Sequence, residues 1–285
     1  MKTRLSLAAI LAAAGLAGAA GADTTLMSVN FNNFTAGQLT TDATGTTAGQ
    51  GGWYTFTNGT GGAANFNIVN DPQAGGSRGQ SLAITAGNTN SGNNVTRFAW
   101  TNDVAANIGT RGPGENLIVA TYDFYMGGAG STSANRYGGY LYDVTGSKIL
   151  AGVTMQNNTG QLFMVANYNN AGTIGNYAFN LGTGAVLSRN TWYRFAVTFD
   201  ITTGRAQAGF STDGGANYTL FFVDGAAAGT LVDEFDLIGS VNAGTAAQGQ
   251  TIGYYDNISV IATPAPGALA LLGVAGLVGR RRRRS

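Results

Sequence analysis

The sequence predicts an all-β protein in which antiparallel strands form a two-sheet sandwich. Its 285 residues include 45 glycines, 10% aromatic residues and only 10% charged residues. Such a polar but weakly charged chain is typical of strands and turns, because helices usually carry many Glu, Lys, Leu and Arg residues. Short runs alternate polar with apolar residues, turn signals separate them, and no helical period persists. A sandwich is the natural way to bury many short strands.

Four runs in the body of the chain are typical of strands: residues 117–126, 161–168, 192–200 and 251–262. In the run 192–200 the alternation predicts that the odd-numbered residues from Tyr193 to Phe199 share the buried face. Trp192 opens this strand and is predicted to lie in the core. No fixed period of 20 to 50 residues repeats along the chain, which argues against a parallel β-helix.

Turns between these runs begin with Asp or Asn and end with Gly. They occupy residues 143–146, 157–160 and 200–204. Glycine tolerates a positive φ at the end of such a turn, so we expect one at Gly146, Gly160 and Gly204. Strands joined by turns of this kind form an antiparallel meander.

The charges are distributed unevenly along the chain. Lys2, Arg4 and five C-terminal arginines lie at the ends, which leaves eight basic and 14 acidic residues in the body, a net charge of −6. A mildly acidic body argues against DNA or RNA as a partner. The chain has no Cys and no His, which excludes disulfides and ordinary zinc sites.

Residues 1–22 are predicted to be a secretory signal peptide. Lys2 and Arg4 form a positive segment, residues 5–16 form an apolar segment, and Ala20 and Ala22 form a small-residue cleavage site. Signal peptidase would then release a mature chain that starts near Asp23. The alternative is an N-terminal membrane helix that is retained.

Residues 263–285 combine a proline motif, an apolar run and an arginine cluster. The run 267–279 has 13 residues. As a helix it would be about 20 Å long, which is short of the roughly 30 Å hydrocarbon core of a bilayer. Pro264 and Pro266 keep the backbone extended before the run, where a processing enzyme can bind it. The arginines are expected on the cytoplasmic side.

This order of features resembles the PEP-CTERM sorting signal. The proline motif reads Pro264, Ala265, Pro266 and Gly267, and the cluster reads Arg280, Arg281, Arg282, Arg283 and Arg284. The resemblance implies cleavage by an exosortase-like enzyme, transient anchoring in the inner membrane, and delivery to the cell surface or extracellular matrix. The Glu of the family's usual Pro-Glu-Pro motif is missing here. A permanent tail anchor and a basic nucleic-acid tail are the alternatives, and the acidic body disfavours the second.

The body, residues 23–262, resembles concanavalin A-like lectin/glucanase domains, which are jelly-roll sandwiches. The segments 31–39, 49–56 and 254–260 carry this resemblance, and 192–215 is similar to the central hairpin of laminin-G-like members. The fold implied is an antiparallel two-sheet jelly roll. Enzymes, lectins and adhesive modules share it, so it does not settle the function.

Catalytic residues are not apparent in the sequence. Glucanases that resemble the body use a Glu-x-Asp-x-x-Glu pattern, but this chain has only Glu115 and Glu234. Asp233 and Asp236 flank Glu234, and we interpret this cluster as a solvated strand edge or turn. Without His there is no Ser-His-Asp triad. We therefore assign no catalytic residue and expect that the protein is not an enzyme.

Aromatic side chains and one aspartate are the candidate ligand residues. Trp53, Tyr54, Trp100 and Tyr140 are candidates for stacking on sugar rings, with a place in the core as the alternative for each. No cofactor is required by the sequence. The resemblance implies a structural calcium that joins the first strand to the last, with Asp256 as the matching ligand, while a local strand-edge contact is the alternative. The loop that starts at Asp42 is a second calcium candidate.

The function expected from the sequence is that of an exported, exosortase-processed, non-catalytic surface or extracellular-matrix protein, associated with exopolysaccharide or adhesion. A lectin-like carbohydrate-binding module is one alternative, and a degenerate glycan hydrolase or lyase is another. The expected partners are signal peptidase, an exosortase-like enzyme and extracellular polysaccharide, with no nucleic acid.

Overall fold

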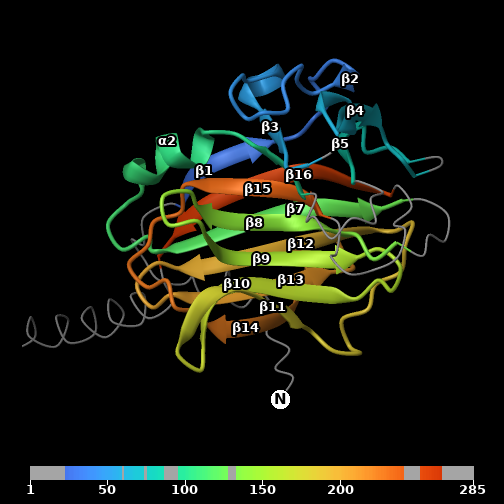
Figure 1. Ribbon diagram of the computed structural model, residues 1–285. Coiled ribbons are helices and arrows are strands. Elements are labelled where there is room, and N and C mark those ends of the chain that lie inside the picture. Colours follow the sequence, from blue (N-terminus) through green and yellow to red (C-terminus); the bar gives the residue numbers. More distant parts are fainter. Residues whose placement is uncertain are drawn as a thin grey trace, which may run out of the picture.

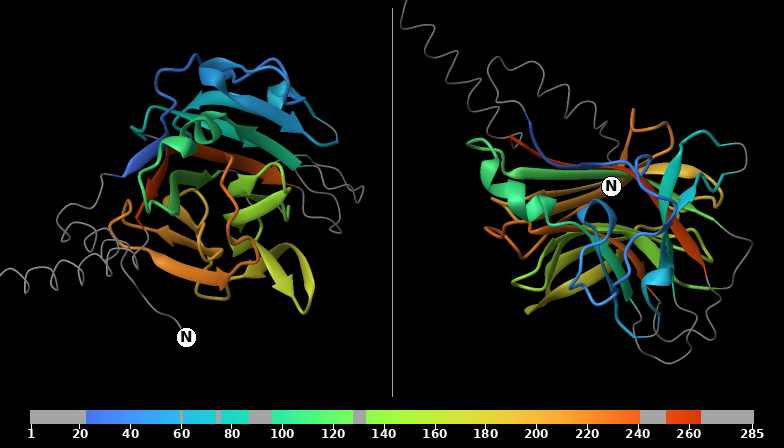
Figure 2. Two further views of the ribbon diagram at one scale, coloured as in Figure 1. Left: turned by 90° about the vertical axis from the view of Figure 1, so that its left-hand side faces the viewer. Right: turned by 90° about the horizontal axis from the view of Figure 1, so that it is seen from above.

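The computed structural model describes residues 23–59, 61–73, 76–86, 96–127, 133–240 and 251–264. Within them, sixteen strands form two antiparallel sheets that lie face to face (Figure 1). The predicted all-β, two-sheet fold is confirmed. Figure 1 looks onto the outer face of the seven-stranded sheet, and the side view in Figure 2 shows the nine-stranded sheet packed behind it.

The nine-stranded sheet has the order β14-β13-β12-β7-β16-β5-β4-β2, with β1 paired to β16. Its strands are β1 (Thr24–Val29), β2 (Gly37–Gln38), β4 (Phe66–Asn70), β5 (Gln80–Thr85), β7 (Leu117–Met126), β12 (Trp192–Asp200), β13 (Arg205–Ser211), β14 (Thr219–Asp224) and β16 (Ile252–Thr263). The predicted strands 117–126 and 192–200 match β7 and β12 at both ends. The predicted strand 251–262 is shifted by one residue in β16.

The seven-stranded sheet has the order β11-β10-β9-β8-β15-β6-β3. Its strands are β3 (Tyr54–Thr57), β6 (Thr96–Trp100), β8 (Arg136–Asp143), β9 (Lys148–Gln156), β10 (Leu162–Asn170), β11 (Thr173–Asn180) and β15 (Glu234–Ser240). The predicted strand 161–168 falls on β10. β15 is inserted between β6 and β8, which are much earlier in the chain, so the middle of this sheet depends on long-range pairing.

The core lies between the two sheets. Tyr193, Phe195, Val197 and Phe199 are 0–7% exposed, which confirms the face predicted for this strand. Tyr122, on β7 of the nine-stranded sheet, packs edge-on against Phe195 and also contacts Phe235 from the seven-stranded sheet, with ring centroids 5.6 and 5.5 Å apart. Such aromatic contacts fix how one sheet is placed on the other.

The short helical segments are α2 (Asp103–Asn107) and three 3₁₀ turns, η1 (Gln50–Gly52), η2 (Ala63–Asn65) and η3 (Ile108–Thr110). The sequence did not predict α2. It is one turn and a half long and buries Val104 next to β1, so packing rather than propensity holds it.

The turn predictions are confirmed at two of three positions. Gly160 and Gly204 have φ values of 69° and 74°. In the turn at 143–146 the positive φ falls on Ser147 instead, at 52°. Gly146 is required there for a different reason, because its N–H donates to Asp143 Oδ1 at 2.9 Å and a Cβ would lie 2.3 Å from Asp143 Oδ2.

Both predicted targeting segments fall outside the described residues. These are the signal peptide with Ala20 and Ala22, and the part of the sorting signal from Ala265 to Ser285. Pro264 is the last residue that the structure describes. Within the described ranges, no helix has the length and apolar character needed to cross a bilayer.

Candidate active site

The outer face of the seven-stranded sheet carries two carboxylates in its middle strand. Phe235 and Leu237 of β15 are fully buried in the core, so Glu234 and Asp236 point to the opposite face. On the neighbouring strand β8, Leu141 is buried in the same way, which directs Tyr140 and Tyr142 outward. The register places Asp236 opposite Tyr140 and Glu234 opposite Tyr142. Directly opposed residues on one face lie within contact distance.

Glu234 and Asp236 lie two residues apart on the same face of β15, and each carboxyl group affects the pKa of the other. Asp236 is 4% exposed, and its Oδ1 atom has no hydrogen-bond partner. Burial, together with the neighbouring Glu234, raises the pKa of Asp236 well above its usual range. Burial also raises the pKa of Glu234, while its hydrogen bond with Asp236 acts in the opposite direction. The two carboxyl groups therefore titrate as a coupled pair, in which burial favours the protonated form and favours it most at Asp236.

This arrangement corrects the sequence interpretation of the cluster. Asp236 is not at a solvated strand edge or turn, because β15 has a hydrogen-bonded strand on each side. None of the ion pairs found among the described residues involves Glu234 or Asp236. The sequence did contain a signal that this segment is a strand, since residues 234–237 alternate acidic and apolar side chains with period two.

A groove of about 350 Å³ lies beside the carboxyl pair, a volume in the usual range of ligand sites. Aromatic and uncharged polar side chains line it: Thr96, Phe98, Tyr140, Tyr142, Ile149, Asn176 and Ser240. Tyr140 is half-buried, and desolvation raises the pKa of its phenol, so it carries its proton at neutral pH. The sequence identified Tyr140 but missed the other lining residues.

An aromatic strip extends the groove toward the edge strand β3. Tyr54 and Trp100 are paired across β3 and β6 and stack with their ring centroids 5.8 Å apart and their planes at 19°. Beside them, Phe56 and Phe98 are 6.3 Å apart, and Phe56 is 37% exposed. Contiguous aromatics on an outer face are uncommon in a protein that binds nothing there.

Three of the four predicted aromatic ligand residues lie on this face. Tyr54, Trp100 and Tyr140 point outward, but Trp53 does not. Trp53 is fully buried, and its ring packs 5.5 Å from that of Phe31. Neighbouring residues at the start of a strand point to opposite faces, so Trp53 and Tyr54 could not both face a ligand. Trp53 is therefore removed from the ligand residues.

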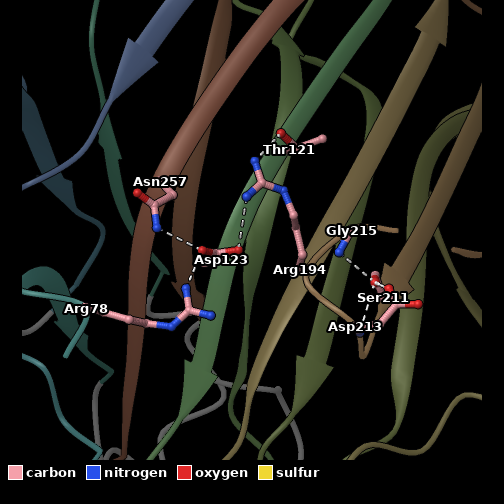
Figure 3. Close-up of polar contacts among 8 residues, drawn as sticks. All are labelled: Arg78, Thr121, Asp123, Arg194, Ser211, Asp213, Gly215 and Asn257. Atoms are coloured by element: carbon pink, nitrogen blue, oxygen red, sulfur yellow. Dashed lines mark hydrogen bonds and ion pairs between the residues drawn. The ribbon is translucent and has the colours of Figure 1, made fainter. Parts of the chain in front are cut away.

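The outer face of the other sheet carries a buried aspartate in a different environment (Figure 3). Asp123 of β7 is ion-paired with Arg78, accepts a hydrogen bond from Asn257 at 2.9 Å, and has Arg194 Nη1 at 3.5 Å. Asn257 adopts a φ of 48° at the bulge of β16, which turns its amide toward Asp123. Two cations and an amide thus satisfy this carboxylate.

Trp192 borders this cluster and corrects another prediction. It is half-buried on the outer face rather than in the core, with the Arg78 guanidinium 4.9 Å from its ring centroid. Its Nε1 donates to Asp71 at 3.3 Å. The alternation that buries Tyr193 requires Trp192 to point outward.

Asp256, the predicted calcium ligand, is fully buried, and neither of its carboxylate oxygens has a hydrogen-bond partner. Burial raises its pKa to about 6. The backbone of Phe31 lies beside it, and the carbonyl oxygens of Phe31 and Phe34 accept hydrogen bonds from the side-chain amide nitrogen of Gln80 at 2.9 and 2.7 Å. These carbonyls are therefore already used, and the Asp256 carboxylate is the oxygen donor that remains for Ca²⁺ at this position. Within the described ranges, no group of three acidic residues is placed to hold a metal ion.

The second calcium candidate does not fit. The carboxylate of Asp42 accepts hydrogen bonds from backbone or hydroxyl groups of Thr44, Thr46 and Thr47 at 2.7–3.2 Å. Its oxygens are already used to close the loop. These hydrogen bonds hold the pKa of Asp42 well below its usual range.

No protein-family model matches the chain, and no curated protein matches its sequence. Among the solved structures that share its fold is an endo-β-1,4-glucuronan lyase from the fungus Trichoderma reesei, with a TM-score of 0.51, 15% identity, and coverage of 81% of this chain and 95% of the lyase chain. Another is a GH131 β-glucanase catalytic domain from Podospora anserina, with a TM-score of 0.51, 13% identity, and coverage of 85% and 99%. The chain therefore has the jelly-roll-like fold that these two catalytic domains share.

The expectation that the protein is not an enzyme is contradicted by these findings. That expectation rested on the lack of a recognised carboxylate motif. The fold is shared with a lyase and a glucanase. The structure also places two adjacent carboxyl groups opposite the tyrosines of an aromatic groove, where the sequence had suggested a solvated strand edge or turn.

Proposed function

We propose that the protein is a polysaccharide-cleaving enzyme whose active surface is the outer face of the seven-stranded sheet. The single observation that carries this proposal is the adjacent pair of Glu234 and Asp236 on the outer face of β15, which no ion pair among the described residues involves and which lies opposite Tyr140 and Tyr142 of the aromatic groove. A buried carboxylic acid that lacks an ionic partner destabilises the fold, and such groups concentrate at functional sites.

The two carboxyl groups have different roles in this proposal. Glu234 is half-buried and reaches the surface, so it is the group that contacts the glycosidic linkage and takes or gives a proton. Asp236 is nearly inaccessible and acts as a positioning residue. Its proton is donated to Glu234, which sets the charge and orientation of the Glu234 carboxylate.

The remaining groups of the groove bind and orient the sugar chain. The phenol of Tyr140, directly opposite Asp236 in the sheet, supplies a second proton-bearing group at the site. Tyr54 and Trp100 offer a stacked aromatic platform on which sugar rings pack through their apolar faces. A long groove with a platform at one end suits a polymer better than a small sugar.

The test is polysaccharide cleavage by the purified protein and by Glu234→Gln. The chain contains only one other glutamate, Glu115, which makes Glu115→Gln a matched control. We expect the wild type and Glu115→Gln to release oligosaccharides and Glu234→Gln to lose about 100-fold or more in rate. Equal rates for all three proteins would contradict the proposal.

We also propose that the protein is exported and then processed at both ends. Support comes from the sequence alone: the signal-peptide features of residues 1–22 and the proline motif, apolar run and arginine cluster of residues 263–285. Mass spectrometry of the protein recovered from the cell surface is the test. Fragments that start near Asp23 and lack Arg280–Arg284 are expected, and intact arginines on surface protein would contradict exosortase-like processing.

We further propose that a structural Ca²⁺ binds at Asp256. The support is a fully buried carboxylate whose two oxygens have no hydrogen-bond partner and which no ion pair among the described residues involves. Asp256 lies on β16, and the backbone of Phe31, two residues after β1, lies beside it. The ion would thus tie the N-terminal segment to the last strand.

A further inference from the structure

The charges around the groove indicate which class of polysaccharide it accepts, on the condition that the proposed function holds. Glu234 and Asp236 are the acidic side chains of β15 on this face, and burial raises the pKa of both, which disfavours their charged forms. Among the described residues of the seven-stranded sheet, Arg136 is the cation near the groove, because Arg97 is 2% exposed and Lys148 pairs with Asp143 at a turn. The face is therefore close to neutral.

Arg136 is poorly placed to bind a string of anions. Its guanidinium lies 3.7 Å from the centroid of the Phe163 ring on β10, and Arg136 is partly buried. A polyuronate carries one carboxylate on every sugar, so tight binding needs several cations along the groove. One stacked arginine beside a carboxyl pair does not meet that need, because the pair repels a neighbouring uronate.

The remaining polar groups of the groove suit hydroxyl groups instead. Thr96, Asn176 and Ser240 line it without charge, and Tyr140 and Tyr142 offer phenol hydroxyls next to ring faces. Asn176 is fixed in place, since its Oδ1 accepts from the Ile149 N–H at 3.0 Å and its Nδ2 donates to the Ser147 carbonyl at 3.1 Å. Rigid neutral donors and acceptors between aromatic rings recognise a sugar by its hydroxyl pattern.

We infer that the groove accepts a neutral polysaccharide and that the protein cleaves it by hydrolysis. A neutral sugar has no carboxylate to acidify the adjacent ring hydrogen, so β-elimination is not available to it. In hydrolysis the glycosidic C–O bond breaks, the hydroxyl of water bonds to the anomeric carbon, and the proton of water ends on the leaving oxygen. No oxidant, reductant or further reactant is needed.

The experiment compares neutral and anionic polymers with the purified protein. The neutral set is mixed-linkage β-glucan, xylan and galactomannan, and the anionic set is alginate, polygalacturonate and polyglucuronate. Release of new reducing ends is measured together with the ultraviolet absorbance of unsaturated products, which only elimination creates. We expect reducing ends from at least one neutral polymer, no unsaturated product, and a KM that changes less than about twofold between low and high salt.

Two outcomes overturn the inference, and they differ in what they say of the proposed function. Cleavage of a polyuronate with an unsaturated product leaves the enzyme assignment intact and refutes the neutral substrate and the hydrolysis. No cleavage of any polymer refutes the proposed function and the inference together. Arg136→Gln sharpens the first distinction, because it should leave neutral-polymer cleavage within about threefold, whereas a larger loss of cleavage would show that Arg136 binds an anionic sugar and would contradict the neutral substrate.

Discussion

The outer faces of the two sheets each hold a buried aspartate, and the two differ in what satisfies them. Asp123 on the nine-stranded sheet has Arg78, Arg194 and Asn257 around it (Figure 3). Asp236 on the seven-stranded sheet has a second carboxyl group, Glu234, and one oxygen without a partner. Both are 4% exposed, so burial alone does not distinguish them.

The difference separates a structural carboxylate from a chemical one. Around Asp123, every charge is compensated, and the side chains come from the segment before β5 and from β7, β12 and β16. Removing a member therefore loosens the sheet. Burial of Asp236 disfavours its ionised form and so favours a protonated carboxyl group beside the groove. Removing the Asp236 carboxyl group should therefore leave the free energy of unfolding unchanged or higher and should lower the rate of polysaccharide cleavage.

The largest effect is expected for Asp236→Asn. The substitution removes the proton that Asp236 shares with Glu234, so the rate of polysaccharide cleavage should fall by roughly 100-fold or more. The free energy of unfolding should stay within about 1 kcal/mol of the wild type or rise, because an amide is not penalised for ionisation. Kinetics and denaturant unfolding check both parts. Full activity, or a collapse of stability, would place Asp236 with Asp123 as a structural group.

The reciprocal substitution is Asp123→Asn. It leaves Arg78 and Arg194 facing each other without the carboxylate between them. Removing one partner of a buried ion pair costs about 3–5 kcal/mol, and the partial exposure of both arginines places this variant near the lower value. Folded Asp123→Asn should retain the wild-type cleavage rate. Urea unfolding measures the loss of unfolding free energy. A loss of cleavage rate in folded Asp123→Asn would contradict the structural role assigned to Asp123.

Calcium removal should have the next largest effect. If Ca²⁺ binds at Asp256, then saturating ion stabilises the native state by about 2–3 kcal/mol at 100 times the dissociation constant. A chelator should therefore lower Tm by several degrees in the wild type. Asp256→Asn should be insensitive to the chelator. An unchanged wild-type Tm in the presence of a chelator would refute calcium binding at Asp256.

The stability of the wild type and of Asp236→Asn should depend differently on pH. The pKa of Asp236 is raised on folding, so its contribution is fully present below the unfolded value of about 4 and is lost as pH rises through the folded pKa. Glu234 and Tyr140 face it and carry raised pKa values themselves. The wild type should thus lose stability as pH rises above about 4, and Asp236→Asn should lose less.

Chelator is present throughout that titration, because the pKa of Asp256 is raised to about 6 and changes in the same range. Asp256 is common to both proteins, so the difference between their Tm curves isolates Asp236 and its partner. Parallel curves for the wild type and Asp236→Asn would show that Asp236 is not protonated in the native state.

The smallest effect is expected for Glu115→Gln. Glu115 is 2% exposed, and its Oε2 accepts from Thr24 Oγ1 and from the Gly112 N–H, each at 2.7 Å. Because both contacts are made to Oε2, a Gln amide oxygen in that position keeps them, so the loss should be at most about 1 kcal/mol with no change in cleavage rate. Thermal unfolding and kinetics measure the two. A loss of rate comparable with that of Glu234→Gln would show that the loss is not specific to Glu234.

The sequence predicted what depends on neighbours along the chain. Alternation in 192–200 placed Tyr193 and Phe195 in the core, and the ends of β7 and β12 were correct, because period-two patterning is a local property. The same alternation, applied strictly, would have turned Trp192 outward. Composition and turn residues were enough for the all-β sandwich.

The site was not predictable in the same way, because it depends on which strands become neighbours. Glu234 lies opposite Tyr142 of the groove only because β15 inserts between β6 and β8, about 90 to 140 residues earlier in the chain. Whether Trp53 or Tyr54 faces outward depends on the register of β3 against β6. No local pattern fixes either pairing, although the alternation at 234–237 was a signal that the segment is a strand.

The most direct measurement is a map of where an oligosaccharide binds. Two-dimensional amide NMR spectra of Glu234→Gln, titrated with a neutral oligosaccharide, report contacts without turnover. The account predicts that shifted resonances concentrate on β6, β8, β9, β11 and β15 around Tyr140 and Asn176, with β12 and β13 unaffected. Shifts centred on Asp123 and Trp192, or no shifts at millimolar sugar, would contradict the assignment of the active surface to the seven-stranded sheet.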